Sequence, residues 1–232
     1  MNVTVHPRPT ENTDITRHSA DKEKHAELVD IALKSGMDRA KIIPTDLIAI
    51  EKRAQVKCLI PRCTSYGRSY TCPPNMPSTA EVREIVGEYR TAILMQVDGS
   101  EEKDGYNETM RRDFNWCYPS VYELMEAVHN TEVRAFDLGW ALAMGFAGGD
   151  CRWCELLGGG VERYGGEALL HANAGGCNCD SGHPCMQEYR ARPAMEAMSI
   201  NVLATARNAG MPFYFSGREK ARIVWNGLVL ID

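Results

Sequence analysis

The sequence lacks the features that mark membrane-spanning, secreted and nucleic-acid-binding proteins. No apolar run approaches the roughly 20 residues that a membrane-spanning helix needs, so we expect no membrane span. The first 20 residues have no apolar core of the kind found in a signal peptide, and we expect a cytoplasmic protein. Lys and Arg number 26 against 31 Asp and Glu, a net charge of −5, whereas phosphate binding needs an excess of basic residues. We therefore expect no nucleic-acid partner.

Several catalytic signatures are also missing. The glycine run at 158–160 does not extend to a Gly-x-Gly-x-x-Gly pattern after a strand, and no Walker A sequence occurs, so nucleotide binding is not indicated. Neither a Gly-x-Ser-x-Gly elbow nor a His-Glu-x-x-His helix is present. The sequence assigns no catalytic residue and leaves open whether the protein is an enzyme.

Cysteine, in contrast, is abundant and clustered. The first group is Cys58, Cys63 and Cys72, which directly precedes Pro73 and Pro74. The second group is Cys151, Cys154, Cys177, Cys179 and Cys185, and Cys117 lies alone between the groups. In the reducing cytoplasm, clustered cysteines are more often metal ligands or redox thiols than structural disulfides. The count allows two four-cysteine sites and one spare cysteine, and short spacings of this kind predict iron–sulfur or soft-metal sites.

The second group has the spacing of a complete [4Fe–4S] site. Two residues separate Cys151 from Cys154, and five separate Cys179 from Cys185. These four cysteines are our preferred ligand set. Cys177 could replace Cys179, because a single residue lies between the two.

The first group supplies three close ligands and leaves the fourth open. Cys117, Cys177, His171 or an exogenous ligand could complete the site. If the fourth position stays open, an iron ion there could bind a substrate, and the protein would then be an enzyme. Alternatively, Cys117 is a buried, unliganded thiol between Trp116 and Tyr118.

Zinc is the main alternative to iron at both groups. It also accepts four cysteines, with Cys-x-x-Cys as the usual half-site, and it would make the protein depend on metal for stability without redox chemistry. Spacing alone separates the two metals poorly. A smaller alternative is that the cysteines of the second group are merely buried or form disulfides.

The first half of the chain reads as alternating helices and strands. Apolar residues at helical spacing predict a helix from about residue 26 to Gly36, and a strand follows over 47–56. Ser78 and Glu81 form a capping box before a helix that ends near Tyr89, and residues 92–97 read as a buried strand. This order predicts a β-α-β unit with the first cysteine group at its crossover.

The second half predicts further helices and a terminal hairpin. A capping box at Ser120 opens a helix, and a second helix over 135–146 leads to the second cysteine group. Pro193 starts another helix, strands follow at 213–215 and 223–231, and the pair Asn226-Gly227 is typical of a hairpin turn. We predict an α+β or α/β fold, with a central mixed sheet, packed helices and two cysteine-rich metal loops. Residues 1–20 form a flexible arm, and residues 21–232 form one metal-binding domain with a glycine-rich insertion at 155–176.

Three stretches of the chain resemble a known family. They are Tyr70-Thr71-Cys72-Pro73-Pro74, the Pro184-Cys185 end of the second group, and Arg192-Pro193-Ala194-Met195-Glu196-Ala197 with the final Gly-Leu-Val-Leu-Ile strand. From about residue 40 onward the chain resembles a prokaryotic family of predicted metal-binding proteins that is common in anaerobes. In that family the cysteines of the second group lie close together, whereas here residues 155–176 separate Cys154 from Cys177. The resemblance implies metal binding and no particular reaction.

These observations lead to three hypotheses on function. The first is an iron–sulfur protein with two [4Fe–4S] clusters that passes electrons to a redox partner protein in an anaerobic system, its acidic surface docking a positively charged partner. The second is a zinc-stapled interaction or assembly subunit, and the third is an enzyme with an open iron at the first site. A homo-oligomer or a hetero-oligomer is possible in each case.

Overall fold

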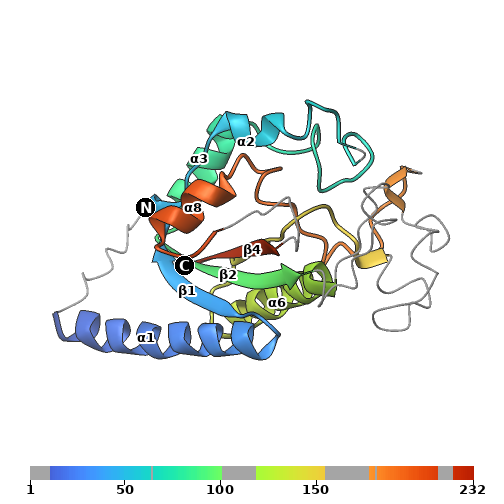
Figure 1. Ribbon diagram of the computed structural model, residues 1–232. Helices are drawn as coiled ribbons and strands as arrows, with labels where there is room; N and C mark the ends of the chain where they lie inside the picture. The colour runs from blue at the N-terminus through green and yellow to red at the C-terminus, as the bar shows by residue number, and fades with distance from the viewer. Residues whose placement is uncertain (1–10, 64, 101–118, 155–177, 181, 214–221) are drawn as a thin grey trace, which may run out of the picture.

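The computed structural model describes residues 11–63, 65–100, 119–154, 178–180, 182–213 and 222–232 (Figure 1). Four strands form one antiparallel sheet in the order β1-β2-β4-β3. Their bounds are Arg39–Pro44 for β1, Thr91–Ser100 for β2, Met144–Phe146 for β3 and Arg222–Ile231 for β4. The α+β class is therefore confirmed, but the named strands make an antiparallel sheet rather than the mixed sheet that we expected.

The α-helices cover both faces of this sheet (Figure 1). They are α1 (Glu11–Lys34), α2 (Lys52–Val56), α3 (Thr79–Gly87), α6 (Pro119–Asp137) and α8 (Val202–Asn208), and two short 3-10 helices are η1 (Thr45–Leu47) and η3 (Asn178–Asp180). The predicted end of the first helix is confirmed, because α1 is followed by Gly36 with a φ of +97°. Residues 11–20, which we placed in the arm, belong to α1. No helix in the described ranges is both long and apolar enough to cross a bilayer.

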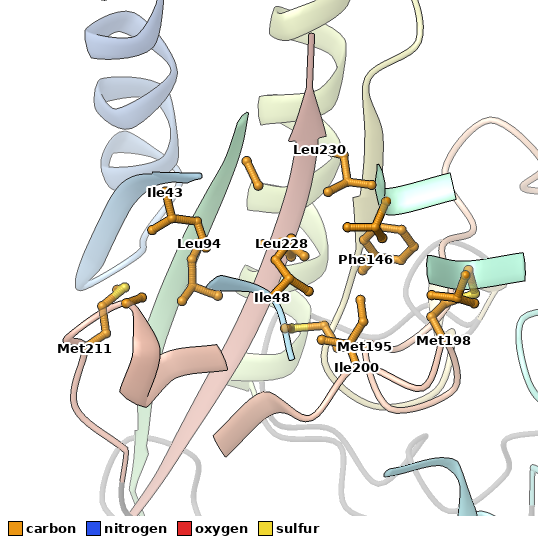
Figure 2. Close-up of a cluster of buried hydrophobic side chains, with 14 residues drawn as sticks. Ile43, Ile48, Leu94, Phe146, Met195, Met198, Ile200, Met211, Leu228 and Leu230 are labelled. Carbon is orange, nitrogen blue, oxygen red and sulfur yellow. The ribbon is translucent and has the colours of Figure 1, made fainter. Parts of the chain in front are cut away.

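Side chains that alternate along β2 build a core on each face of the sheet. Ile93, Met95 and Val97 pack against α1 and α6, where Leu28 and Leu124 are fully buried. On the opposite face, side chains of the strands pack against α3 and the segment 195–211 (Figure 2). Its largest fully buried side chains are Ile43, Leu94, Phe146, Met195, Ile200, Leu228 and Leu230.

The predicted β-α-β unit is wrong. The first strand lies earlier than we expected, at 39–44, and residues 52–56 form the helix α2. β1 and β2 pair antiparallel, with Pro44 opposite Thr91. The chain thus leaves the sheet after β1 and returns at the same end, and α2, the first cysteine group and α3 all lie in this excursion. The capping box of Ser78 and Glu81 at the start of α3 is confirmed.

A single helix replaces the two that we expected before the second cysteine group. α6 already contains Ser120 in its first turn, so Ser120 is not a cap, and α6 ends before Gly139 with a φ of +102°. Phe146, expected on a second helix, lies in β3 and is fully buried against the sheet. The chain therefore enters the second cysteine group from a strand.

Two predictions near the C-terminus are also wrong. No helix starts at Pro193, because Ala147 pairs with Ala194 and the extended segment donates the Met195 N–H to the Ala147 carbonyl at 3.1 Å. Asn226 and Gly227 lie inside β4, opposite Gln96 and Met95, instead of forming a turn. The strand at 223–231 is confirmed, whereas the strand expected at 213–215 falls largely outside the described residues.

Burial explains why Asn226 and Gly227 continue the strand. The Gln96 amide donates to the Asn226 side-chain oxygen at 2.8 Å, so both buried amides have partners. A Cβ atom at Gly227 would lie 2.6 Å from Val128 of α6. The absence of a side chain at Gly227 lets α6 lie close to the sheet. In the sequence, an Asn-Gly pair at such a position looks the same as one in a hairpin turn.

Candidate metal centre

The first cysteine group lies in the chain between α2 and α3, and tight turns hold it together. The Cys58 N–H donates to the Gln55 carbonyl just after α2, and the Cys63 N–H donates to the Cys58 carbonyl, both at 3.0 Å. The Cys72 N–H donates to the Ser69 carbonyl at 3.2 Å. Backbone bonds of this kind do not depend on regular secondary structure. They order the backbone at each of the three cysteines.

The three thiols of the first group lie within electrostatic reach of one another. The pKa of Cys72 is raised to about 12, mainly by burial and also by the charges of Asp150, Cys63 and Cys58. Burial also raises the pKa of Cys58, with smaller contributions from Cys63 and Glu196. Cys63 itself is exposed. The structure therefore brings together the three first-group cysteines that we predicted as ligands.

The second group draws four cysteines from three separate segments. Cys151 and Cys154 follow β3, Cys179 lies in η3, and Cys185 lies in the turn beyond it. The pKa of Cys151 is raised to about 12, mainly by burial. The Trp153 N–H acts against this rise, and the neighbouring thiols of Cys185, Cys154 and Cys179 add to it. These four are the preferred ligand set from the sequence. Trp153 is buried and packs with α6, which anchors the first two.

Sulfur atoms in both groups accept hydrogen bonds from the protein. A Ser69 side-chain hydrogen bond lowers the pKa of Cys72, and a Trp153 backbone hydrogen bond does the same for Cys151, although burial dominates at both. The Gln187 N–H donates to the Cys185 sulfur at 3.4 Å. Such bonds favour the thiolate, which is the form that binds metal.

Side-chain contacts join the two cysteine groups. The Ser65 hydroxyl, two residues after Cys63, donates to a carboxylate oxygen of Asp150 at 2.7 Å. The Tyr70 hydroxyl donates to the His183 carbonyl at 2.8 Å, close to Cys185 in the chain. In Figure 1 both segments lie at the same end of the sheet. The two groups are therefore neighbours in space, although about 80 residues separate them in sequence.

Two acidic residues at the first group were not predicted. Asp150 accepts from Ser65 and also from Arg152 at 3.3 Å, and its charge acts on Cys72. Burial raises the pKa of the Glu196 carboxyl, and its charge acts on Cys58. The available signals were the position of Asp150 directly before Cys151 and that of Glu196 inside the Arg-Pro motif. Neither signal reveals a contact with a group so distant in sequence.

Other predicted residues lie outside the part that the structure describes. They are Cys117, Cys177, His171 and the glycine-rich insertion at 155–176, so the fourth ligand of the first site and the choice between Cys177 and Cys179 stay predictions. The seven cysteines within the described ranges form no disulfide. Among those same residues, no three or more His, Cys, Asp or Glu side chains are arranged to hold a single metal ion.

The antiparallel α+β fold and its two neighbouring groups of thiols define a cysteine-rich protein with candidate sites for a soft metal. A family model described as "Predicted metal-binding protein (DUF2284)" matches residues 41–231, and the chain belongs to this family. The resemblance seen in the sequence is thereby confirmed. The match includes both cysteine groups. Neither the curated proteins nor the solved structures contain a match to the chain.

Proposed function

We propose that this metal-binding protein is a cytoplasmic iron–sulfur protein that holds two [4Fe–4S] clusters and transfers electrons in an anaerobic redox system. Cys151, Cys154, Cys179 and Cys185 would hold one cluster. Cys58, Cys63 and Cys72 would hold the other, with a fourth ligand still to be found. The observation that carries the proposal is that two sulfur-rich sites lie side by side in one small domain.

The chemistry of the donor set supports a cluster over a single ion. Cysteine thiols are the ligands that iron–sulfur clusters use, and hydrogen bonds to sulfur, as at Cys72, Cys151 and Cys185, tune cluster potentials. A tetrahedral zinc site with Zn–S bonds of about 2.3 Å needs its thiolates within roughly 4 Å of one another. The described thiols influence one another, yet none of their groups is that tight. A [4Fe–4S] cluster is larger than one ion and would accept thiols that lie farther apart.

The contacts between the loops support electron transfer. A bound cluster supplies reversible one-electron chemistry, and the protein contributes its position, its hydrogen bonds and its shielding from water. The Ser65–Asp150 and Tyr70–His183 hydrogen bonds keep the two sites together. Two centres in such proximity form a short internal path. A single buried site would not need this arrangement.

One feature of the first group favours a second candidate function, that of an enzyme with an open iron. The described residues bring only three cysteines together there, and Cys63 is exposed to solvent. A three-cysteine site with an open coordination position can bind a substrate atom directly. The two candidates share the same clusters and differ in whether the first site keeps a fourth protein ligand.

Metal analysis of protein purified without oxygen tests the proposal. We expect about eight iron and about eight sulfide ions per chain, as two [4Fe–4S] clusters require. Cys63→Ser and Cys154→Ser serve as controls for each other, because each should remove the paramagnetic signal of one cluster and leave the other. Colourless protein that contains zinc without iron or sulfide would establish the zinc-stapled alternative. Cys117→Ser then tests Cys117 as the fourth ligand: an unchanged first cluster excludes it and leaves the enzyme hypothesis standing, with Cys177 and His171 as the protein ligands still to be tested in the same way.

A further inference from the structure

The surface around the first cysteine group differs in charge from the rest of the protein. Residues 51–72 contain five basic side chains and one acidic side chain, although the whole chain carries a net charge of −5. All five basic residues are exposed: Lys52, Arg53, Lys57, Arg62 and Arg68. The acidic residue, Glu51, forms an ion pair with Arg53 and accepts from Asn201 at 2.9 Å. The side chains of this segment therefore carry a net positive charge.

Exposed aliphatic side chains lie within the same surface. Val56, Leu59 and Ile60 are 39%, 43% and 75% exposed, and they come from α2 and the turn between Cys58 and Cys63. Exposed aliphatic side chains that lie close together on a soluble protein often mark a surface that contacts another molecule. Val56, Leu59 and Ile60 are such a group. We name these three residues, together with the five basic ones, the first-site surface.

We propose that the first-site surface docks an acidic electron-carrier protein, which exchanges electrons with the first site. This inference rests on the proposed function and names the partner class that it requires. The basic side chains would attract and orient the acidic carrier, and the aliphatic residues would form the dry contact at its centre. The net charge of the whole chain predicts a positively charged partner, but association depends on the local electric field at the contact.

The position of this surface suits electron transfer. Cys63 is itself exposed and is preceded by Pro61 and Arg62 in the same turn. A carrier seated here lies against the first cysteine group and not against the helix layer of α1 and α6. The Arg62 guanidinium lies over the Tyr66 ring at 5.0 Å, so one positive charge of the surface comes from the residue next to Cys63 in the chain.

Nucleic acid fits this surface less well. A phosphate backbone gains nothing from three exposed aliphatic side chains, and its affinity comes from many evenly spaced basic contacts. The aromatic side chains that stack bases are not among the exposed residues of this segment, since Tyr66 and Tyr70 are only partly exposed. Transient redox complexes, in contrast, use small contact areas that combine charge and apolar surface.

Charge reversal tests the proposal. The double variant Lys52→Glu/Lys57→Glu is compared with Lys22→Glu/Lys34→Glu, which makes the same charge change on exposed residues of α1. The probes are a small acidic ferredoxin, a basic cytochrome c of opposite charge and a single-stranded RNA, all titrated at low ionic strength. We expect the first variant to weaken ferredoxin binding by at least about tenfold and to flatten its salt dependence, and the α1 variant to bind as the unchanged protein does.

Further variants test the other charges and the aliphatic residues of the first-site surface separately. Arg62→Glu/Arg68→Glu should repeat the loss of binding, and Ile60→Ser should weaken binding without changing its salt dependence, while Leu142→Ser, at another exposed aliphatic residue, should not. Iron and sulfide are measured on every variant. Equal ferredoxin binding by all variants, or preferential binding of cytochrome c or single-stranded RNA, overturns the docking surface. If the purified protein contains zinc and still binds ferredoxin through the first-site surface, the cluster assignment is overturned and the docking surface stands.

Discussion

The Arg192 Nε lies 2.8 Å from both carboxylate oxygens of Glu132, in a pair that is mostly shielded from solvent. The Glu132 carboxylate also accepts the Gly145 N–H at 2.9 Å. The guanidinium of Arg192 donates to the Ala191 carbonyl at 2.9 Å and to the Tyr189 carbonyl at 3.2 Å. This ion pair therefore ties α6 and β3 to the turn that follows Cys185.

Removal of Arg192 should destabilise both the fold and the second site. In Arg192→Ala, Glu132 keeps its charge in a buried position without a cationic partner, which costs about 3–5 kcal/mol. Urea unfolding measures the loss, and iron content reports on the second cluster. The matched control is Arg134→Ala on the same helix, because Arg134 pairs with Glu27 at a half-exposed position, where a pair contributes about 1 kcal/mol or less. Equal losses for the two variants would show that the buried pair has no special role.

Gly227→Ala should destabilise the protein through the contact of α6 with β4. The added methyl group would lie 2.6 Å from a methyl of Val128 and 3.0 Å from Leu124, so the helix must move away from the sheet. Overpacking of this kind costs about 1–3 kcal/mol. Gly87→Ala is the control, since nothing lies within 4 Å of its added methyl group. Thermal unfolding compares the two, and a neutral Gly227→Ala would mean that α6 is not in close contact here.

The sequence predicts elements whose signal is local and misreads those that depend on tertiary contacts. The Ser78 capping box, the strand at 92–97 and the end of the first helix follow from neighbouring residues alone. The Asn226-Gly227 pair was misread because a glycine that allows close packing looks like a glycine in a turn. Phe146 was misread because the apolar residues over 135–146 have helical spacing. In the structure they belong to three different elements: the end of α6, a turn and the short buried strand β3.

The candidate site shows the same limit. Short spacing predicts which cysteines share a loop, since Cys58 to Cys72 and Cys151 to Cys154 are local in sequence. Nothing local predicts that Asp150 lies beside Cys72, because that contact depends on how two distant loops meet. The positive charge around Cys58 was overlooked for another reason: the net charge of the chain conceals a local excess.

The buried thiols should react slowly with alkylating agents in the metal-free protein. Burial raises the pKa of Cys72 and Cys151 to about 12, so at pH 8 about one molecule in ten thousand carries either thiolate. The exposed Cys63 should therefore be modified first by iodoacetamide, as followed by peptide mass spectrometry. Because the thiolate fraction rises about tenfold per pH unit below the pKa, modification of Cys72 should be about a hundredfold faster at pH 10. Equal rates for Cys63 and Cys72 at pH 8 would contradict the burial of Cys72.

The charge of Asp150 should act on the first cysteine group and not on the second. Asp150→Asn keeps the shape of the side chain and an oxygen that can accept from Ser65, but it removes the negative charge that raises the pKa of Cys72. The pKa of Cys72 then falls toward its ordinary value, although burial still dominates it, and alkylation of Cys72 in metal-free protein at pH 8 should accelerate by about twofold to tenfold. Cys151 is the internal reference, because the charges that act on its pKa are those of other thiols and not that of Asp150. Asp46→Asn, at an exposed residue of η1, is the control variant. In protein with clusters, the loss of a neighbouring negative charge should raise the reduction potential of the first cluster in a titration followed by paramagnetic resonance.

Two outcomes would contradict this role of Asp150. An equal acceleration of alkylation at Cys72 and Cys151 would indicate general loosening of the loops. An unchanged alkylation rate at Cys72 would show that the charge of Asp150 does not act on the first cysteine group.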